Sequence, residues 1–123
     1  MSNMPRDYII YAVDFDDTLC KSIWPGTGEP NEKLADFVRK EHEKGNKIIL
    51  WTCRCGKLLD DAVQWCKDNN IPIDAVNNNI PETVEDWGVN CRKVHADYYI
   101  DDKMLNAFEL GVIQKSIEDI TYQ

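Results

Sequence analysis

Acidic residues crowd together directly after an apolar run in the sequence YAVDFDDTLC, as Asp14, Asp16 and Asp17. Aspartate is a poor strand former, and like charges held side by side repel one another unless a cation or a reacting group lies between them. A second acidic pair, Asp101 and Asp102, follows another apolar run further along the chain. These two clusters are the residues best suited to carry chemistry.

Paired carboxylates favour the chemistry of a hard divalent cation. Carboxylate oxygens are preferred ligands of Mg²⁺, which also keeps several waters. A softer metal is not expected, because the Cys53-x-Cys55 pair lacks a second cysteine knuckle or a histidine at a familiar spacing for zinc. A carboxylate beside Mg²⁺ can attack phosphorus to form an aspartyl phosphate, while a second carboxyl group protonates the leaving oxygen and then activates water.

Apolar runs precede these acids and predict strands. Residues 8–13 and 47–52 are almost continuously apolar, which is the pattern of strands covered on both faces of a sheet. Two shorter runs, 71–76 and 96–100, predict two further strands, and Pro72 fits near the start of the first of these.

Amphipathic segments between the apolar runs predict helices. One begins after the N-cap Asn31 and ends at Gly45. A second has four apolar residues at helical spacing, which are Leu59, Ala62, Val63 and Cys66. A short third helix is expected around residues 82–87, and the segment 111–123 is expected to form a last helix or strand.

Strands that alternate with helices predict a three-layer, Rossmann-like α/β fold, with a central parallel sheet and helices on both faces. The length of 123 residues fits a single domain over 1–123. In such sheets ligands bind beyond the carboxyl ends of the strands. The polar residues expected at that edge are Asp14, Asp16, Thr52, Asp101 and Asp102.

The overall composition limits the partners. A formal net charge of −8 and a pI near 4.6 provide no long-range attraction to nucleic acid or to an anionic membrane. No apolar run is long enough to span a bilayer, and the start of the sequence lacks the apolar core of a signal peptide, so we expect a cytoplasmic protein. Five irregularly spaced cysteines fit reduced thiols. We expect a phosphorylated small molecule as the partner, and a homo-oligomer is left open.

Four motifs, in the right order, resemble those of the haloacid dehalogenase-like hydrolase superfamily. DFDDTL resembles its D-x-D-x-T motif, and the threonine that ends IILWT resembles the residue that binds the phosphoryl group. Lys93 resembles the lysine upstream of the fourth strand, and YYIDDK resembles the strand that ends in two acids. The resemblance extends from Tyr8 to Lys103 and is greatest to small capless members with ILWT-x-R and K-x-x-A-D-x-x-I-D-D stretches, which are regarded as phosphatases.

The resemblance implies a Mg²⁺-dependent phosphatase that forms an aspartyl phosphate, since dehalogenases of the superfamily lack the second acid of the first motif. Asp14 would be the nucleophile and Asp16 the general acid and base. Thr52 and Lys93 would hold the phosphoryl group, with Arg54 as a further anion clamp. Mg²⁺ would be bound by four residues: Asp14, Asp16 through its backbone carbonyl, Asp101, and Asp102 in a supporting position.

Two features depart from the motifs of the superfamily. Asp17 stands where many members have glycine, and the sequence gives this third acid no role. Arg92 and Lys103 are alternatives to Lys93 as the cation of the third motif. Neither departure changes the expected class of reaction.

The segments in which superfamily members insert a cap domain are short. Residues 19–30 leave 12 positions and residues 77–92 leave 16, and neither segment can bury a core of its own. We therefore expect an open site without a cap domain, covered at most by a flap around Trp24, by the asparagine run 77–79 and by a neighbouring subunit. Trp51 is expected to pack within the protein, as are Trp65 and Trp87.

Two other functions stay open. A signalling receiver domain also has a parallel sheet and a phosphorylated aspartate with Mg²⁺, but its acid pair follows the first strand and a lone aspartate follows the third. A degenerate member of the superfamily would bind a phosphorylated ligand without turnover, although both Asp14 and Asp16 are present.

Overall fold

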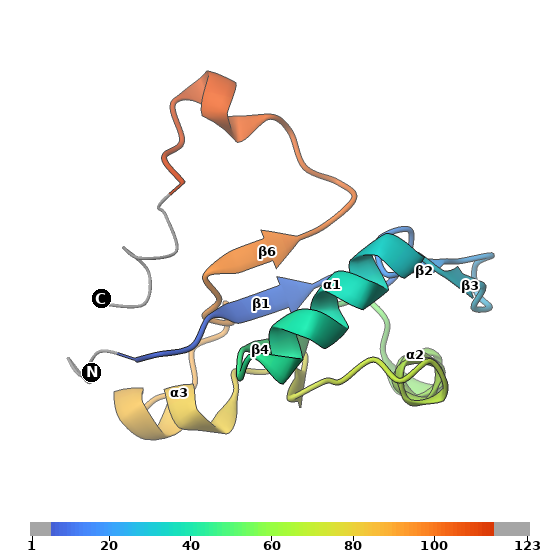
Figure 1. The fold of residues 1–123 in the computed structure, drawn as a ribbon, viewed down its shortest axis with the longest axis horizontal. Coiled ribbons are helices and arrows are strands. Elements are labelled where there is room, and N and C mark those ends of the chain that lie inside the picture. The colour runs from blue at the N-terminus through green and yellow to red at the C-terminus, as the bar shows by residue number, and fades with distance from the viewer. Residues whose placement is uncertain (1–5, 115–123) are drawn as a thin grey trace.

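Four parallel strands form the middle layer of the fold, in the order β5-β4-β1-β6. The computed structural model describes residues 6–114. The strands of this sheet are β1 (Ile10–Val13), β4 (Lys47–Leu50), β5 (Ala75–Val76) and β6 (Tyr98–Ile100). The helices are α1 (Glu32–Glu43), α2 (Gly56–Asp68) and α3 (Pro81–Trp87), and a short 3-10 helix, η1 (Ala107–Leu110), extends away from β6 (Figure 1).

An apolar core lies on each face of the sheet, because successive side chains of β1 point to opposite faces. Tyr11 and Val13 pack with residues of α1 and α2, whereas Ile10 and Ala12 pack with Ile80 at the start of α3. All four β1 side chains are buried. The predicted α/β fold, with a parallel sheet between two helical layers, is confirmed.

The carboxyl ends of three strands lie level with one another. In the parallel register, Val13 pairs with Leu50 of β4 and with Ile100 of β6. The N–H of Asp14 donates to the Ile100 carbonyl at 2.9 Å, and the N–H of Trp51 donates to the Val13 carbonyl at 2.9 Å. The residues that follow β1, β4 and β6 therefore emerge side by side at one edge.

The helices begin and end close to the predicted positions. The Asn31 side chain accepts the N–H of Leu34 at 3.4 Å, and Gly45 follows α1 with a φ of +96°, which favours glycine. α2 buries Ala62 and Cys66 on its predicted apolar face, and α3 covers the predicted third helix. No helix within residues 6–114 is long and apolar enough to cross a membrane.

Three of the strands, β1, β5 and β6, begin later than predicted, whereas β4 begins at Lys47 as predicted and ends earlier, at Leu50. Side chains bind backbone N–H groups at the late starts. The predicted strand 71–76 contracts to β5, where the Asp74 carboxylate accepts the Ile48 N–H at 2.8 Å. Before β1, the Asn46 side chain accepts the Ile9 N–H at 2.9 Å. Of the predicted C-terminal element, residues 111–114 contain neither helix nor strand, and residues 115–123 lie outside the described part of the chain.

A small hairpin occupies the segment between β1 and α1. The strands β2 (Cys20–Lys21) and β3 (Glu29–Pro30) pair antiparallel, and residues 22–28 between them form what we call the flap. A Cβ atom at Gly28 would lie 1.9 Å from the Lys21 carbonyl oxygen, so only glycine fits there. The Trp65 indole N–H donates to the Gly28 carbonyl at 2.8 Å and anchors this end of the flap to α2.

A buried carboxylate joins α1 to β1. Glu41 accepts hydrogen bonds from the Tyr11 hydroxyl at 2.6 Å, the Asn46 amide at 3.2 Å and the Lys44 ammonium at 2.7 Å. Burial raises the pKa of Glu41, but the hydrogen bonds from Lys44 and Tyr11 outweigh it, and the pKa is lowered overall. The ionised form of Glu41 therefore stabilises the folded state.

We expect Glu41→Gln to lower the free energy of unfolding at pH 7 by about 1–3 kcal/mol, because the hydrogen-bonding groups lose a charged acceptor. The pKa of Glu41 is lower in the folded state than in the unfolded state. Its contribution to stability is therefore present above the unfolded pKa and is lost as the pH falls through the folded pKa. Urea unfolding between pH 7 and pH 3 measures this. The loss of stability on acidification should be smaller in Glu41→Gln than in the wild type, and equal pH dependence would contradict the role given to Glu41.

Candidate active site

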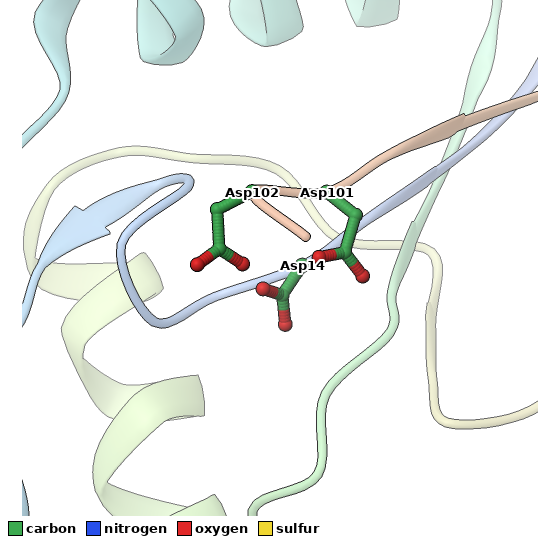
Figure 2. Close-up of side chains that lie close together, drawn as sticks. All are labelled: Asp14, Asp101 and Asp102. Carbon is green, nitrogen blue, oxygen red and sulfur yellow. The ribbon is translucent and has the colours of Figure 1, made fainter. Parts of the chain in front are cut away.

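Three carboxylates from two strands meet at the carboxyl edge of the sheet. Asp14 follows β1, while Asp101 and Asp102 follow β6, and one oxygen of each lies within 4.8 Å of the others. Figure 2 shows Asp14 between the two acids that follow β6. The contact arises from the strand register, because Val13 and Ile100 are paired and the next residue of each strand is an aspartate. The structure thus brings together three of the four predicted metal ligands.

Asp14 lies in the least exposed position of the three. Burial raises its pKa to about 6, and the negative charge of Asp101 acts in the same direction. The Thr18 hydroxyl lies 3.2 Å from an Asp14 carboxylate oxygen and 3.5 Å from one of Asp102. A cation within the cluster would offset these repulsions and favour the ionised form of Asp14.

The donor set of this cluster fits a hard divalent cation. It consists of three carboxylates, with the Thr18 hydroxyl next to two of them. Cys53 and Cys55 are exposed and are not among the residues that form the cluster. Oxygen ligands of this kind suit Mg²⁺, which Asp14, Asp101 and Asp102 would hold.

Asp16, the other acid of the first motif, points to Arg54. The guanidinium donates to the two Asp16 carboxylate oxygens at 2.9 Å from Nε and at 2.7 Å from Nη2. Burial raises the pKa of Asp16, but the hydrogen bonds from Arg54 contribute to an overall lowering. Asp16 is therefore held as a carboxylate, which is the form that acts as a base.

The resemblance implies that Arg54 binds a substrate anion, but the structure places its side chain inside the protein. Its side chain is 0% exposed. Apart from Asp16, it donates to backbone carbonyls of Pro25 at 3.1 Å, Gly26 at 2.9 Å and Leu58 at 3.4 Å. A guanidinium has five N–H groups, and all of them are donated to protein oxygens here. As placed, Arg54 cannot also clamp a substrate anion.

Thr52 lies at the predicted edge, just beyond β4. Its N–H donates to the Asn77 side-chain oxygen at 2.8 Å, and its hydroxyl oxygen accepts the Arg54 N–H at 3.1 Å. The hydroxyl hydrogen of Thr52 can still be donated to a ligand, because that oxygen acts as an acceptor in the bond from Arg54. The placement is compatible with the predicted contact to a phosphoryl group.

The structure places Lys103, rather than Lys93, at the acidic cluster. Lys93 is exposed, and its ammonium lies 5.2 Å from the centre of the Tyr99 ring. The Lys103 ammonium donates to Asp102 at 2.9 Å, and this hydrogen bond raises the pKa of Lys103. The same pairing lowers the pKa of Asp102 to about 2. The cation next to the acids thus comes from the residue that directly follows them in YYIDDK.

The asparagine run 77–79 has a structural role, as expected of asparagines in a turn, and the structure shows which groups it binds. Asn77 has a φ of +49° and accepts the Thr52 N–H, so it fixes the end of β4. Asn79 is buried, and its side chain binds Asn90, the Cys91 carbonyl and the N–H of His95. In the sequence, the position of the three asparagines directly after a predicted strand indicates this role.

Asp17 lies outside the cluster that contains Asp14. It is exposed and has a φ of +59°, in the left-handed region that favours glycine but that aspartate also tolerates. Glycine also adopts this conformation readily. Asp17 lines the cavity next to Asp101 and Asp102 but is not part of their cluster.

Comparison with known proteins gives a structural relative without a stated activity. A scan against protein families finds no match, and no curated protein matches the chain. A solved structure of a conserved protein from Bacteroides thetaiotaomicron is 29% identical and superposes with a TM-score of 0.70. The match covers 95% of this chain and 100% of that one. The shared fold supports the α/β architecture described above, and membership of the haloacid dehalogenase-like superfamily stays a prediction.

In the absence of divalent cations, we expect Asp14→Asn to be more stable than the wild type by about 1–2 kcal/mol at pH 7.5, because it removes a half-buried charge that water screens only in part. The folded pKa of Asp14 is raised to about 6, so the contribution of Asp14 to stability should be lost as the pH rises from about 4 to 6, and the stability advantage of Asp14→Asn should develop over that range. Urea unfolding in the presence of a chelator measures both effects.

Mg²⁺ provides the complementary measurement on the same two proteins. Added Mg²⁺ should raise the melting temperature of the wild type, and this rise should be smaller in Asp14→Asn. An equal effect of Mg²⁺ on both proteins would show that the ion does not bind at the cluster.

Proposed function

We propose that the protein is a Mg²⁺-dependent phosphatase of the haloacid dehalogenase-like type, which hydrolyses phosphate monoesters through an aspartyl phosphate on Asp14. The observation that carries the proposal is the juxtaposition of Asp14 with Asp101 and Asp102 within 4.8 Å. The motif resemblance supports it, because these three acids stand at the positions of the nucleophile and of the metal-binding pair. The free thiols of all five cysteines fit a cytoplasmic site of action.

Asp14 and Asp16 have separate roles in the proposed reaction. The Asp14 carboxylate forms a bond to phosphorus as the bond from phosphorus to the leaving oxygen breaks, and Asp16 gives its proton to that oxygen. Water then attacks phosphorus, Asp16 accepts its proton, and the bond to Asp14 breaks to release phosphate. When bound, Mg²⁺ would neutralise charge on the acids and on the phosphoryl group.

The two acids have different environments, as separate roles require. Within residues 6–114, no ion pair competes for the Asp14 carboxylate, which lies next to the acids from β6. Asp16 is held by Arg54 in its base form, which suits the hydrolysis of the intermediate. The negative charge of a bound phosphate ester would raise the pKa of Asp16 and favour the protonated form that the first step needs.

The substrate is expected to be a small phosphate ester bound at an open site. The flap spans only residues 22–28, and α3 is the only helix between β5 and β6 within the described chain. An open site encloses little of a small ligand and gains little binding energy from its remote parts. We therefore expect weak discrimination among small esters.

A non-catalytic binder of a phosphorylated ligand is the second candidate. The observation that favours it is the Asp16–Arg54 pair, because a general acid must carry a proton and this pair lowers the pKa of Asp16. In this function, the acidic cluster and the threonines would bind a phosphoryl group through a cation without breaking its ester bond.

A panel of esters separates the two functions. We expect purified protein to hydrolyse p-nitrophenyl phosphate and several sugar or nucleoside monophosphates in Mg²⁺, and to lose this activity in chelator. Asp14→Asn should abolish turnover, and Asp16→Ala should lower it by about 10²- to 10⁴-fold. Asp68→Asn is the matched control, because Asp68 is an exposed residue at the end of α2 and lies outside the cluster. Tight binding of an ester without hydrolysis would instead support the binder.

Lys103 should contribute more to activity than Lys93. It is next to the acidic cluster and can offset the negative charge that an ester brings to it. We expect Lys103→Gln to lower kcat/KM by at least about tenfold, and Lys93→Gln to have a much smaller effect. Steady-state kinetics on a single ester decides this, since the opposite ranking would restore the assignment of Lys93 that the motif implies.

A further inference from the structure

Arg54 is an unusually buried cation. Arginine is mostly exposed in proteins, and a buried charge must be both paired and hydrogen-bonded. The Arg54 side chain is 0% exposed, its charge is paired with Asp16, and its other N–H groups are bound by backbone carbonyls. A guanidinium satisfied in this way holds its partners in one arrangement, because each partner loses a charge-assisted hydrogen bond if it moves.

The partners of Arg54 come from three separate parts of the chain. Asp16 follows β1, Leu58 belongs to α2, and Pro25 and Gly26 lie at the tip of the flap. The end of the flap is anchored elsewhere, by Gly28, which binds Trp65 and the Cys20 thiol. Arg54 thus binds the tip of the flap directly to the carboxylate of Asp16.

Two aromatic rings complete the surroundings of the guanidinium. Its central carbon lies 5.0 Å from the centre of the Phe15 ring and 4.9 Å from that of the Trp24 ring. Trp24 is 62% exposed, yet it lies next to the cation. A cation near an aromatic face is attracted to it, and the ring also limits the access of water to the Asp16–Arg54 pair. Trp24 therefore has a structural partner within the protein.

We infer that Arg54 is a positioning residue that joins the flap to Asp16, and that Trp24 acts by covering this junction and not by contacting substrate. The effect on catalysis rests on the proposed function, whereas the attachment of the flap does not. If the junction is broken, the flap tip and the Asp16 carboxylate both lose their fixed positions.

This inference differs measurably from a role of Trp24 as a substrate platform. A platform would bind some esters better than others, so its removal would change KM selectively. A positioning role acts on Asp16, which takes part in the turnover of every ester, so its loss should lower kcat by a similar factor for all of them.

The test compares Arg54→Lys and Trp24→Ala with the wild type, with Arg39→Lys as the matched control. Lysine keeps the charge but cannot form the bidentate pair or reach three carbonyls. Arg39 also binds backbone carbonyls, those of Asn69 and Asn70, but lies away from the flap. Amide hydrogen exchange of residues 22–28, followed by mass spectrometry without substrate, reports the attachment of the flap.

We expect exchange in the flap to accelerate at least about fivefold in Arg54→Lys and in Trp24→Ala, with no change in Arg39→Lys. With esters, kcat should fall at least about tenfold in Arg54→Lys and by a similar factor for every ester, while KM changes little. Should Arg54→Lys fail to fold, Trp24→Ala still decides the question, because Trp24 lies on the surface.

Unchanged flap exchange in both variants would overturn the inference. So would an ester-selective change of KM in Trp24→Ala at constant kcat, which would make Trp24 a substrate contact. If the wild type hydrolyses no ester, the proposed function fails, but the exchange measurement still decides whether Arg54 holds the flap.

Discussion

The pairing of β1 with a strand on each side is the constraint on which the site depends. Tyr11 and Val13 lie in one apolar core and Ile10 and Ala12 in the other, so a slip of one residue would exchange the two faces. The same register places Asp14 one residue beyond the paired end of β1, with its N–H bound to the Ile100 carbonyl. The free energy of apolar burial therefore holds the carboxylates together against their mutual repulsion.

Asp14 and Asp16 show how one short motif can give two carboxyl groups opposite properties. They are two residues apart, yet burial and a neighbouring aspartate raise the pKa of Asp14, whereas Arg54 lowers that of Asp16. Paired acids with separate roles need such a difference in environment. Here the difference arises from the turn after β1, which directs one side chain to the end of β6 and the other to the flap.

Sequence reasoning succeeded where the signal was local. The apolar runs before Asp14 and Thr52, and the helix between Asn31 and Gly45, were predicted because burial on both faces and capping leave marks within a few residues. β5 is shorter than predicted because the Asp74 side chain takes the place of a backbone acceptor, which no apolar pattern reveals.

Two site residues could not be placed from the sequence, because their positions depend on distant segments. The partners of Arg54 include Pro25 and Gly26, about thirty positions away, and these meet the guanidinium only after the flap has folded. Likewise, both Lys93 and Lys103 are lysines that could serve as the cation of the third motif. Which of them lies next to the acids depends on the path of the chain around β6. Motif spacing predicted which acids gather, but not which cations accompany them.

The charges of the site determine the order in which the metal and the ester would bind in the proposed reaction. The chain carries a net charge of −8, and three carboxylates meet where a phosphate ester would have to bind, with Lys103 as the neighbouring cation. Without a divalent cation, this edge repels an anion both at long range and at contact. The acids must therefore be neutralised before an ester can approach Asp14. In the proposed reaction, the repulsion that makes the metal-free cluster costly to fold would therefore make substrate binding, and not only the chemical step, depend on the metal.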